Sequence, residues 1–459
     1  MTSRDVHVIG GGPAGAAAAL LLATWGHSVT LVTKTASEHD LAVSVPPSCA
    51  KLFDAIGAAA DIERAGFLRS TGNTVWWGNH DDRVEYFAAG QHGWQLEINE
   101  LSQLLIHRAV DAGARTAVSP ESAGSPALVL DCTGRSGVLA RSKHLREFDG
   151  PRTVALVGEW RCEQGWPVPD DTHTLIESYE AGWVWSVPTR RGTRHIAAMV
   201  DPQRSDLQRG GSSLATYQAE LQKTRVFRSL IETASLESGP WGWDASPYHA
   251  REYAGDGWLL VGDAGSFIDP LSSAGVKKAL ASAWLAAIVV NTCLTTPQAA
   301  GAARQFFSTR EREIHQHLLR EGERFVAAAA GDYLHPFWDE RASEDDVTTD
   351  ADDVRRAFER LKSRDVFHAR RGEMLQIEPR PCVRGNLIVL EPHLVADHGE
   401  APVRYVRGVD VLTLVSLAPG EQSIPDLYDA FVRQCGPTPL HDFLFALATA
   451  VSRRWLVSE

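Results

Sequence analysis

The chain has 459 residues, a hydrophobic fraction of 44% and a formal net charge of -13 at pH 7. This length allows two or three domains, while the acidic balance and the lack of a long uncharged apolar stretch argue against nucleic-acid and membrane partners. The six cysteines form no CxxC pair, so we expect no metal site and no disulfide framework, and we expect a cytoplasmic protein.

The N-terminal region predicts a βαβ unit. An apolar strand at 6–9 runs into a glycine-rich turn, a helix rich in Ala and Leu follows at 14–25, and a second apolar strand covers 28–32. Residues 96–112 predict a further helix and residues 127–130 another buried strand. This order indicates an α/β fold whose parallel sheet is covered on both faces.

The middle of the chain has a different pattern. Short β-prone stretches between 151 and 250, separated by turn residues, predict an antiparallel sheet that could form the wall of a substrate cleft. Buried-strand character returns at 258–261, and a helix follows at 276–294. We therefore predict a discontinuous Rossmann-like cofactor-binding domain, residues 1–150 and 251–330, with a substrate-binding β-sheet domain inserted at 151–250.

The C-terminal part is predicted to be separate. Residues 331–382 are expected to be an acidic linker with a helix, and residues 383–459 combine short strands with three helices in a winged-helix-like α+β order. A DNA-binding wing is usually basic, whereas residues 383–459 carry six Arg, no Lys and nine Asp plus Glu. We therefore expect this unit to be a module that binds a protein or peptide or serves in packing.

A GxGxxG pattern, Gly10, Gly12 and Gly15, stands between the first strand and the first helix. Gly10 permits a tight turn, Gly12 lets the backbone approach a pyrophosphate, and Gly15 lets the helix pack against the strand. The unpaired N–H groups and the positive dipole at the helix N-terminus then face the phosphates. The pattern in this context predicts a dinucleotide site.

Two later segments resemble the flavin signatures of the flavin monooxygenases. Residues 131–137 contain their Asp-x-x-Gly-Arg segment, and residues 262–270 contain a Gly-Asp and an Asp-Pro pair like those of their second signature. The resemblance implies FAD, with helix N–H groups near residue 275 facing the pyrimidine edge of the flavin. The residues expected to hold FAD are Gly10, Gly12, Ala14, Gly15, Thr33, Lys34, Asp131, Gly134, Arg135, Gly262, Asp263, Pro270, Ser273 and Gly275.

Some positions differ from the usual pattern in a way that weakens the expected hold on FAD. Dinucleotide sites commonly place an acid at the end of the second strand to bind the ribose, and this chain has Thr33 and Lys34 there. Ile98 stands where relatives often have a flavin-contacting Arg. We therefore expect FAD to be bound less tightly than usual.

Residues 182–188 (Gly-Trp-Val-Trp-Ser-Val-Pro) resemble the Trp-x-Trp-x-Ile-Pro signature of the flavin-dependent halogenases. The resemblance covers roughly residues 5–330 and places Trp183, Trp185 and Asn73 at the substrate cleft. Halogenases also need a lysine in the strand after the Pro-rich loop, but residues 70–78 contain none. Tryptophan halogenases carry a Glu where this chain has Leu-Ser-Ser at 271–273. The chain therefore lacks the apparatus expected for halogenation.

What remains of the resemblance implies an FAD-dependent monooxygenase that uses NAD(P)H and O2 to hydroxylate an aromatic substrate. A base could deprotonate or polarise the aromatic ring, and the candidates near the expected cleft are His249, Asp244, Glu177 and Tyr248. Residues of these types are more often structural than catalytic.

One subgroup of this family resembles the chain most. Its members hydroxylate a tryptophan side chain within a polypeptide during maturation of the tryptophylquinone of amine-oxidising enzymes. The resemblance implies a protein substrate, the small subunit of quinohemoprotein amine dehydrogenase, bound partly by the C-terminal domain. Two alternatives stay open. One is a halogenase or small-molecule aromatic hydroxylase, and the other is a non-catalytic flavin-binding scaffold, which Thr33 and Ile98 would suit.

Overall fold

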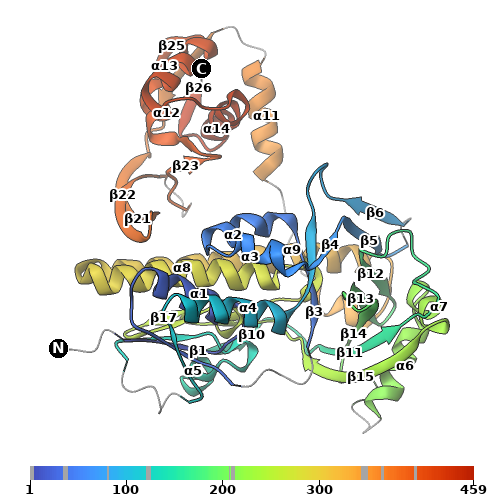
Figure 1. The fold of residues 1–459 in the computed structure, drawn as a ribbon. Helices are drawn as coiled ribbons and strands as arrows, with labels where there is room; N and C mark the ends of the chain where they lie inside the picture. Colours follow the sequence, from blue (N-terminus) through green and yellow to red (C-terminus); the bar gives the residue numbers. More distant parts are fainter. Residues whose placement is uncertain are drawn as a thin grey trace. The chain divides into compact units, whose positions relative to one another are not determined.

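The protein is described here by a computed structural model, which covers residues 5–34, 40–79, 82–119, 126–205, 207, 212–342, 350–362, 366–396 and 401–458. It divides into two compact units, residues 1–343 and 344–459, both shown as ribbons in Figure 1. Residues 343–349, part of the predicted acidic linker, lie outside the described residues.

A six-stranded sheet forms the cofactor layer of the first unit. Its strands, in order across the sheet, are β17 (Ala254–Gly255), β18 (Trp258–Leu260), β9 (Leu128–Asp131), β1 (Val6–Ile9), β2 (Val29–Val32) and β8 (Arg115–Ala117). Every neighbouring pair is parallel except β17 with β18. The chain leaves this sheet after β9 and returns at β17. The predicted α/β fold with a Rossmann-like parallel sheet is confirmed.

Three helices pack on this layer, α1 (Pro13–Thr24), α4 (Ile98–Asp111) and α8 (Gly275–Thr295). Helix α1 contacts both of the others, and Figure 1 shows them side by side. By length and composition alone α8 could cross a membrane, but 67% of its apolar stretch is buried inside the protein. Its apolar residues are therefore explained by its place in the core.

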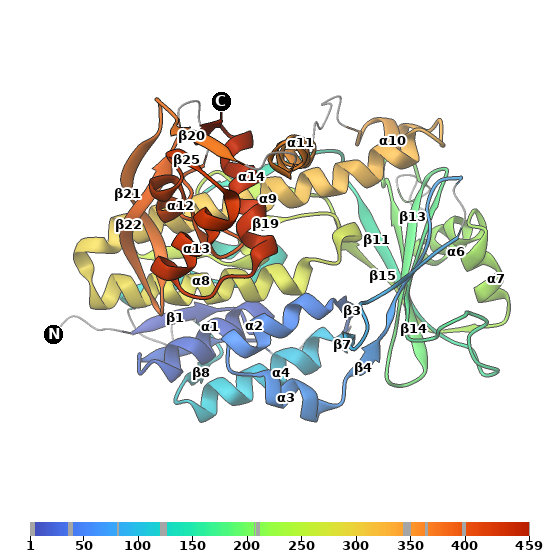
Figure 2. The same cartoon turned by 90° about the horizontal axis from the view of Figure 1, so that it is seen from above.

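A seven-stranded sheet forms the second layer. Its strands, in order, are β15 (Ser235–Asp244), β11 (Val154–Arg161), β14 (Thr193–Val200), β13 (Gly182–Pro188), β12 (Thr174–Tyr179), β5 (Gly72–Trp76) and β6 (Arg83–Tyr86). All pairs are antiparallel except β5 with β12. Two strands of this sheet thus come from before the insertion predicted at 151–250. Figure 2 shows its long strands beyond the end of the helical layer that contains α8.

Helices α6 (Ser213–Gln222) and α7 (Val226–Glu232) pack on one face of the seven-stranded sheet, which leaves the other face for the site described below. Two three-stranded sheets connect the layers, one of β3 (Ala42–Val45), β7 (Gly93–Glu97) and β4 (Leu68–Ser70), the other of β10 (Arg146–Phe148), β16 (Tyr248–Ala250) and β19 (Ser266–Phe267). The shorter helices of this region are α2 (Ala50–Ala55), α3 (Ala59–Ala65) and α5 (Val138–Ser142).

The first unit continues beyond residue 330, where the sequence predicts a linker. The long helix α9 (Ala300–Ala330) is followed by α10 (Pro336–Asp339). Phe337 and Trp338 are fully buried in the same hydrophobic cluster as Trp183 and Met199. Through these two side chains residues 331–342 pack on the first unit, where the sequence predicts a linker.

The second unit has a core of its own, which includes Phe367, Phe431, Phe443 and Trp455. Its helices are α11 (Asp350–Lys362), α12 (Val411–Leu417), α13 (Ile424–Cys435) and α14 (Leu440–Ser452). Its strands are β20 (Phe367–Arg371), β21 (Gln376–Arg384), β22 (Leu387–Val395), β23 (Tyr405–Val406), β24 (Val409–Asp410), β25 (Gly420–Gln422) and β26 (Leu456–Ser458).

Candidate functional site

The glycine turn at the start of α1 has the geometry of a dinucleotide cradle. Gly10 has φ +112°, and a Cβ there would overlap the carbonyl oxygen of Cys132. A Cβ on Gly15 would overlap the carbonyl oxygen of Gly10. By contrast, a Cβ on Gly12 would meet nothing within 4 Å, so open space lies at the N-terminus of α1 beside Ala14. Unpaired N–H groups of the first helical turn can bind a phosphate there.

The end of β2 has Thr33 where dinucleotide sites usually have an acid, and the position of its side chain explains why residue 11 is a glycine. Thr33 takes the place of the usual acid, and its hydroxyl donates to the carbonyl oxygen of Lys34. A Cβ on Gly11 would overlap the Thr33 hydroxyl, so Gly11 is required for packing although the GxGxxG pattern does not include it.

Asp131 does not have the role that the sequence predicts. It is fully buried, one carboxylate oxygen accepts from the N–H and the hydroxyl of Thr133, and the other accepts from the N–H of Leu139. The carboxylate therefore shapes the loop that carries Gly134 and Arg135, and it holds a cofactor only indirectly.

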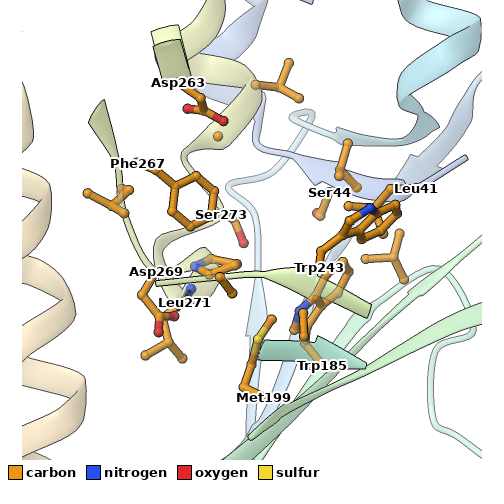
Figure 3. A pocket seen from close by; sticks show the side chains of 18 of the residues that line it. Leu41, Ser44, Trp185, Met199, Trp243, Asp263, Phe267, Asp269, Leu271 and Ser273 are labelled. Carbon is orange, nitrogen blue, oxygen red and sulfur yellow. Dashed lines mark hydrogen bonds between the residues drawn. The ribbon is translucent and has the colours of Figure 1, made fainter. Parts of the chain in front are cut away.

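A cavity of about 360 Å³ lies between the cofactor layer and the seven-stranded sheet, and Figure 3 shows the side chains around it. This volume is within the usual range of small-molecule pockets. From the cofactor side it is lined by Pro13, Ile98, Arg135, Asp263, Phe267, Asp269, Pro270, Leu271, Ser273, Gly275 and Lys278. From the sheet and its neighbours it is lined by Leu41, Val43, Ser44, Ala155, Val157, Thr174, Ile176, Trp183, Trp185, Val187, Met199, Trp243 and Asp244.

Arg135 forms an ion pair at the edge of this cavity. One of its terminal nitrogens, Nη2, lies 2.7 Å from Asp244 and donates to the carbonyl oxygen of Ser246. The guanidinium carbon lies 4.3 Å from the ring centre of Phe267 and 5.0 Å from that of Tyr248. The other terminal nitrogen, Nη1, is buried and has no hydrogen-bond partner among the described residues. The cavity therefore contains a positively charged donor that lacks an acceptor.

Asp244 is held in its ionised form by the same contacts. Burial alone would raise its pKa, but hydrogen bonds from Ser246 and the charge of Arg135 outweigh burial, and the pKa lies below its usual value. In the opposite direction, burial lowers the pKa of Arg135 although Asp244 partly compensates. The pair fixes the orientation of the guanidinium, and Asp244 acts on the cavity mainly through Arg135.

The N-terminal turn of α8 supplies a second charged contact, which the sequence analysis did not single out. The Lys278 side chain is 2% exposed, its ammonium donates to the carbonyl oxygen of Ser266, and it lies 3.3 Å from Asp263. Two adjacent lysines, Lys277 and Lys278, in an otherwise apolar helix were the signal that could have identified it. The aromatic side chains of Phe267 and Trp243 had no such signal, because they are ordinary core residues by pattern.

Of the four proposed catalytic bases, Asp244 is the one that lines the cavity. Glu177 follows the cavity-lining residues Thr174 and Ile176 on β12, and because side chains alternate along a strand it points to the face opposite to theirs. There it accepts hydrogen bonds from the N–H groups of Arg225, Val226 and Phe227 at the start of α7. The expectation that Glu177 lies at the cleft is wrong, since its carboxylate caps a helix.

The remaining candidates lie next to the cavity. The Tyr248 ring is stacked on Phe267 at 6.1 Å, and its hydroxyl donates to the carbonyl oxygen of Asp263. His249 points elsewhere and contacts Asp149. Asn73 pairs in register with Thr174, which lines the cavity, but Asn73 itself is one strand further out.

The arrangement fits FAD. Open space at Gly12 suits a pyrophosphate, Arg135 offers a buried donor without an acceptor, and α8 points its N-terminal turn at the cavity from Gly275. Gly262, with φ +62°, and Asp263 bring the chain close to the same space. The residues that would hold FAD therefore come from three segments far apart in the sequence.

Sequence comparisons agree with this geometry. Residues 3–127 match the family model described as "FAD binding domain". The chain is 27% identical to the tryptophan 2-halogenase of Chondromyces crocatus over 354 residues, which are 70% of this chain and 66% of that protein. It is 26% identical to the flavin-dependent halogenase armH3 of Armillaria mellea over 369 residues, 69% of this chain and 73% of that protein. The chain thus spans about two thirds of the length of these relatives.

Solved structures share the fold. The flavin-dependent halogenase CmlS superposes with a TM-score of 0.81 at 20% identity, covering 100% of this chain and 96% of that one. QhpG, a peptidyl tryptophan dihydroxylase essential for tryptophylquinone cofactor biogenesis, superposes with a TM-score of 0.69 at 22% identity, covering 98% and 99%. At these identities the likeness concerns the fold, and the matched domain identifies FAD as the cofactor.

Proposed function

We propose that this chain, an FAD-binding member of the flavin-dependent halogenase and monooxygenase family, hydroxylates the indole ring of a tryptophan residue in a peptide or protein. The observation that carries the proposal is the chemistry of the cavity wall. It is aromatic and apolar at Trp183, Trp185, Trp243 and Met199, and it offers no unengaged lysine. An indole ring suits such a wall, because aromatic rings pack edge to face or offset on one another.

The cations of the cavity are already engaged. Among the described lining residues they are Arg135, paired with Asp244, and Lys278, bonded to Ser266 and Asp263. Lys278 is on the cofactor side, in the first turn of α8. No lysine occurs at residues 70–78, where the resemblance to halogenases calls for one, and residue 271 is a leucine. Residues 70–78 and residue 271 therefore provide no lysine or glutamate that would direct an oxidised halogen to the substrate.

FAD, when bound and reduced by NAD(P)H, supplies the electrons and the reaction with O2. The chain's own residues do the rest. Arg135 and the N-terminal turn of α8 place positive charge at the cofactor, Asp244 keeps the guanidinium oriented, and the aromatic wall positions the ring and excludes water. Glu177 and His249 have no place in this scheme, since neither lines the cavity.

A peptide substrate is supported by the neighbour QhpG, which matches almost the whole length of this chain. Following the resemblance, we propose the small subunit of a quinohemoprotein amine dehydrogenase as the substrate. The test is incubation of the FAD-loaded protein with NAD(P)H, O2 and a precursor of that subunit, followed by mass spectrometry of its tryptophan peptides. We expect oxygen to be added to one tryptophan. Turnover of free aromatic molecules without any change in the precursor would contradict the proposal.

Halogenation is the second candidate, because the relatives named above are halogenases. The same incubation with chloride or bromide distinguishes the two reactions. A halogenated tryptophan or a halogenated free indole would establish halogenation. An oxygenated product that forms independently of halide would support hydroxylation. Removal of FAD should abolish either product.

A further inference from the structure

Three side chains that can bind a metal converge outside the cavity. Asp149, His249 and His315 each offer one ligand atom, and these atoms all lie within 4.8 Å of one another. Nδ1 of His249 is 2.6 Å from one oxygen of Asp149, and Nε2 of His315 is 3.1 Å from the other oxygen. The two imidazole rings are 5.5 Å apart between centroids.

The three residues come from separate elements. Asp149 follows β10, His249 is in β16, and His315 is in the middle of α9. Strands β10 and β16 pair with each other, which aligns Glu147 with His249, while α9 approaches from outside the sheet. The exposed fractions of the Asp149 and His315 side chains are 12% and 4%, and that of His249 is 31%. The cluster is therefore held rigidly on two sides and open to solvent at His249.

The separations suit a tetrahedral metal ion. With zinc bonds of about 2.1 Å, neighbouring ligand atoms lie about 3.4 Å apart. The ligand atoms of the three side chains all lie within 4.8 Å of one another, so small side-chain movements would bring them to this spacing. Two imidazoles and one carboxylate are the ligand set of many zinc sites that keep a fourth, open position. Of the available ions, zinc and its first-row neighbours prefer imidazole, whereas calcium and magnesium prefer oxygen.

We propose that Asp149, His249 and His315 bind one divalent transition-metal ion, zinc by ligand chemistry, and that this ion joins α9 to the β10–β16 sheet. The fourth position, at the solvent-facing side of His249, is taken by water. Neither the relatives nor the proposed hydroxylation is needed for this inference.

The surroundings of His315 provide independent support. Its second nitrogen, Nδ1, is buried and has no hydrogen-bond partner among the described residues. One helical turn earlier, the carboxylate of Glu311 is also buried, with the charge of Lys278 and the Ser282 side chain acting on it. Residues four apart lie on the same face of a helix. A metal-bound histidine commonly directs its other N–H toward a carboxylate, directly or through water. No direct hydrogen bond joins His315 to Glu311, so Glu311 would act as this acceptor through a water.

The site would matter beyond its own residues. Tyr248, next to His249 in β16, lies under Phe267 and Arg135 at the edge of the FAD cavity. An ion that holds β16 against α9 would restrict the movement of β16, and therefore of Tyr248 at the edge of the FAD cavity. Hydrogen bonds from the two histidines to Asp149, without any metal, are the competing explanation of the cluster.

The test is metal binding by the full-length protein, measured without regard to turnover. The protein is stripped with a chelator and titrated with Co2+ and Zn2+, with the absorption spectrum of Co2+ reporting its coordination. We expect one ion per chain, a Co2+ spectrum typical of four-coordinate nitrogen and oxygen ligation that Zn2+ abolishes by displacement, and a higher melting temperature with Zn2+. Absence of binding at micromolar metal would overturn the proposal.

Variants locate the site. His249→Ala and His315→Ala should each remove the Co2+ spectrum, whereas His317→Ala, an exposed histidine of the same helix, should leave it unchanged. Glu311→Gln should weaken metal affinity by about 10- to 100-fold, as for other supporting carboxylates. Because His315 is buried, the His315→Ala protein could misfold. The deciding measurement is therefore metal binding by the His249→Ala protein, since His249 is partly exposed. Unchanged binding by a folded His249→Ala protein would assign the cluster to hydrogen bonding alone.

Discussion

Glu177 illustrates how residue type alone misleads. A buried carboxylate on the strand before the Trp-Val-Trp segment suggests a catalytic base, but in the structure it accepts N–H bonds from the first residues of α7. A negative charge at a helix N-terminus satisfies donors that have no partner in the helix and interacts favourably with the helix dipole. Its burial therefore follows from capping α7 and needs no catalytic role.

We expect Glu177→Gln to lower the free energy of unfolding by about 1–3 kcal/mol, because hydrogen bonds to a charged group are replaced by weaker ones. Turnover per folded molecule should stay near the wild-type value. Chemical denaturation and a steady-state assay on the same preparations measure both quantities. Glu180→Gln, at an exposed position nearby, should change stability by less than about 0.5 kcal/mol. A stable Glu177→Gln protein with little turnover would restore the catalytic interpretation.

At the scale of elements, the segment between β19 and α8 forms part of the cavity wall and contains a carboxyl group, Asp269, whose ionisation is disfavoured by burial. Asp269 in this segment is half-buried, accepts from the N–H of Leu271 and lines the cavity. Burial raises its pKa from 3.8 to about 6, against the lowering effects of the Leu271 bond and of Arg341. Between these two values the folded protein binds more protons at this residue than the unfolded chain.

The free energy of unfolding should therefore fall as the pH rises through this window, by the linkage between proton binding and stability. Asp269→Asn, whose amide oxygen can still accept from Leu271, should flatten this part of the pH profile. The comparison is denaturant unfolding at several pH values between 4 and 6 for wild type, Asp269→Asn and the exposed control Asp54→Asn. A profile for Asp269→Asn that parallels the wild-type curve would contradict the assignment.

Elements defined by local pattern were predictable, and those defined by distant partners were not. The βαβ opening, α8 and the three C-terminal helices follow from apolar periodicity and caps. Ser423, for example, accepts from the N–H of Asp426 at the start of α13. Strand β5 joins β12 across about a hundred residues, which no local signal encodes. Strand β21 was not predicted, because Pro379 and Pro381 argue against a central strand. Among the described residues β21 pairs with β22 alone, and such an edge strand tolerates proline.

The same distinction holds at the scale of the whole molecule. The glycine turn was predictable because its pattern lies within six residues, between a strand and a helix, although Gly10 also packs against the distant Cys132. By contrast, the pairing of Arg135 with Asp244, and the meeting of Asp149, His249 and His315, join residues of separate elements that are far apart in the sequence. No metal site was expected from the sequence, because no CxxC pair is present. Histidines at irregular spacing give no such local pattern, so the sequence could not indicate this cluster. Chemistry made by packing elements together becomes visible only when those elements are placed.

The candidate site belongs to one of the two compact units. Every residue around the cavity, and every residue expected to hold FAD, is within 1–343, while the second unit has its own hydrophobic core. We therefore expect a chain ending at Ser343 to bind FAD with an affinity close to that of the full-length protein. Its reaction with a protein substrate should be much weaker, because we propose that the second unit contributes to substrate binding, whereas reaction with a short tryptophan peptide should persist.

Flavin absorbance after gel filtration measures the first expectation, and parallel assays with protein and short-peptide substrates measure the second. The decisive quantity is the ratio of kcat/KM for the two substrates, since partial misfolding of the shortened chain lowers both values together and leaves their ratio unchanged. A shortened chain with the full-length ratio would remove the second unit from substrate recognition. Loss of FAD binding from a folded shortened chain would instead mean that the cofactor site extends beyond the first unit.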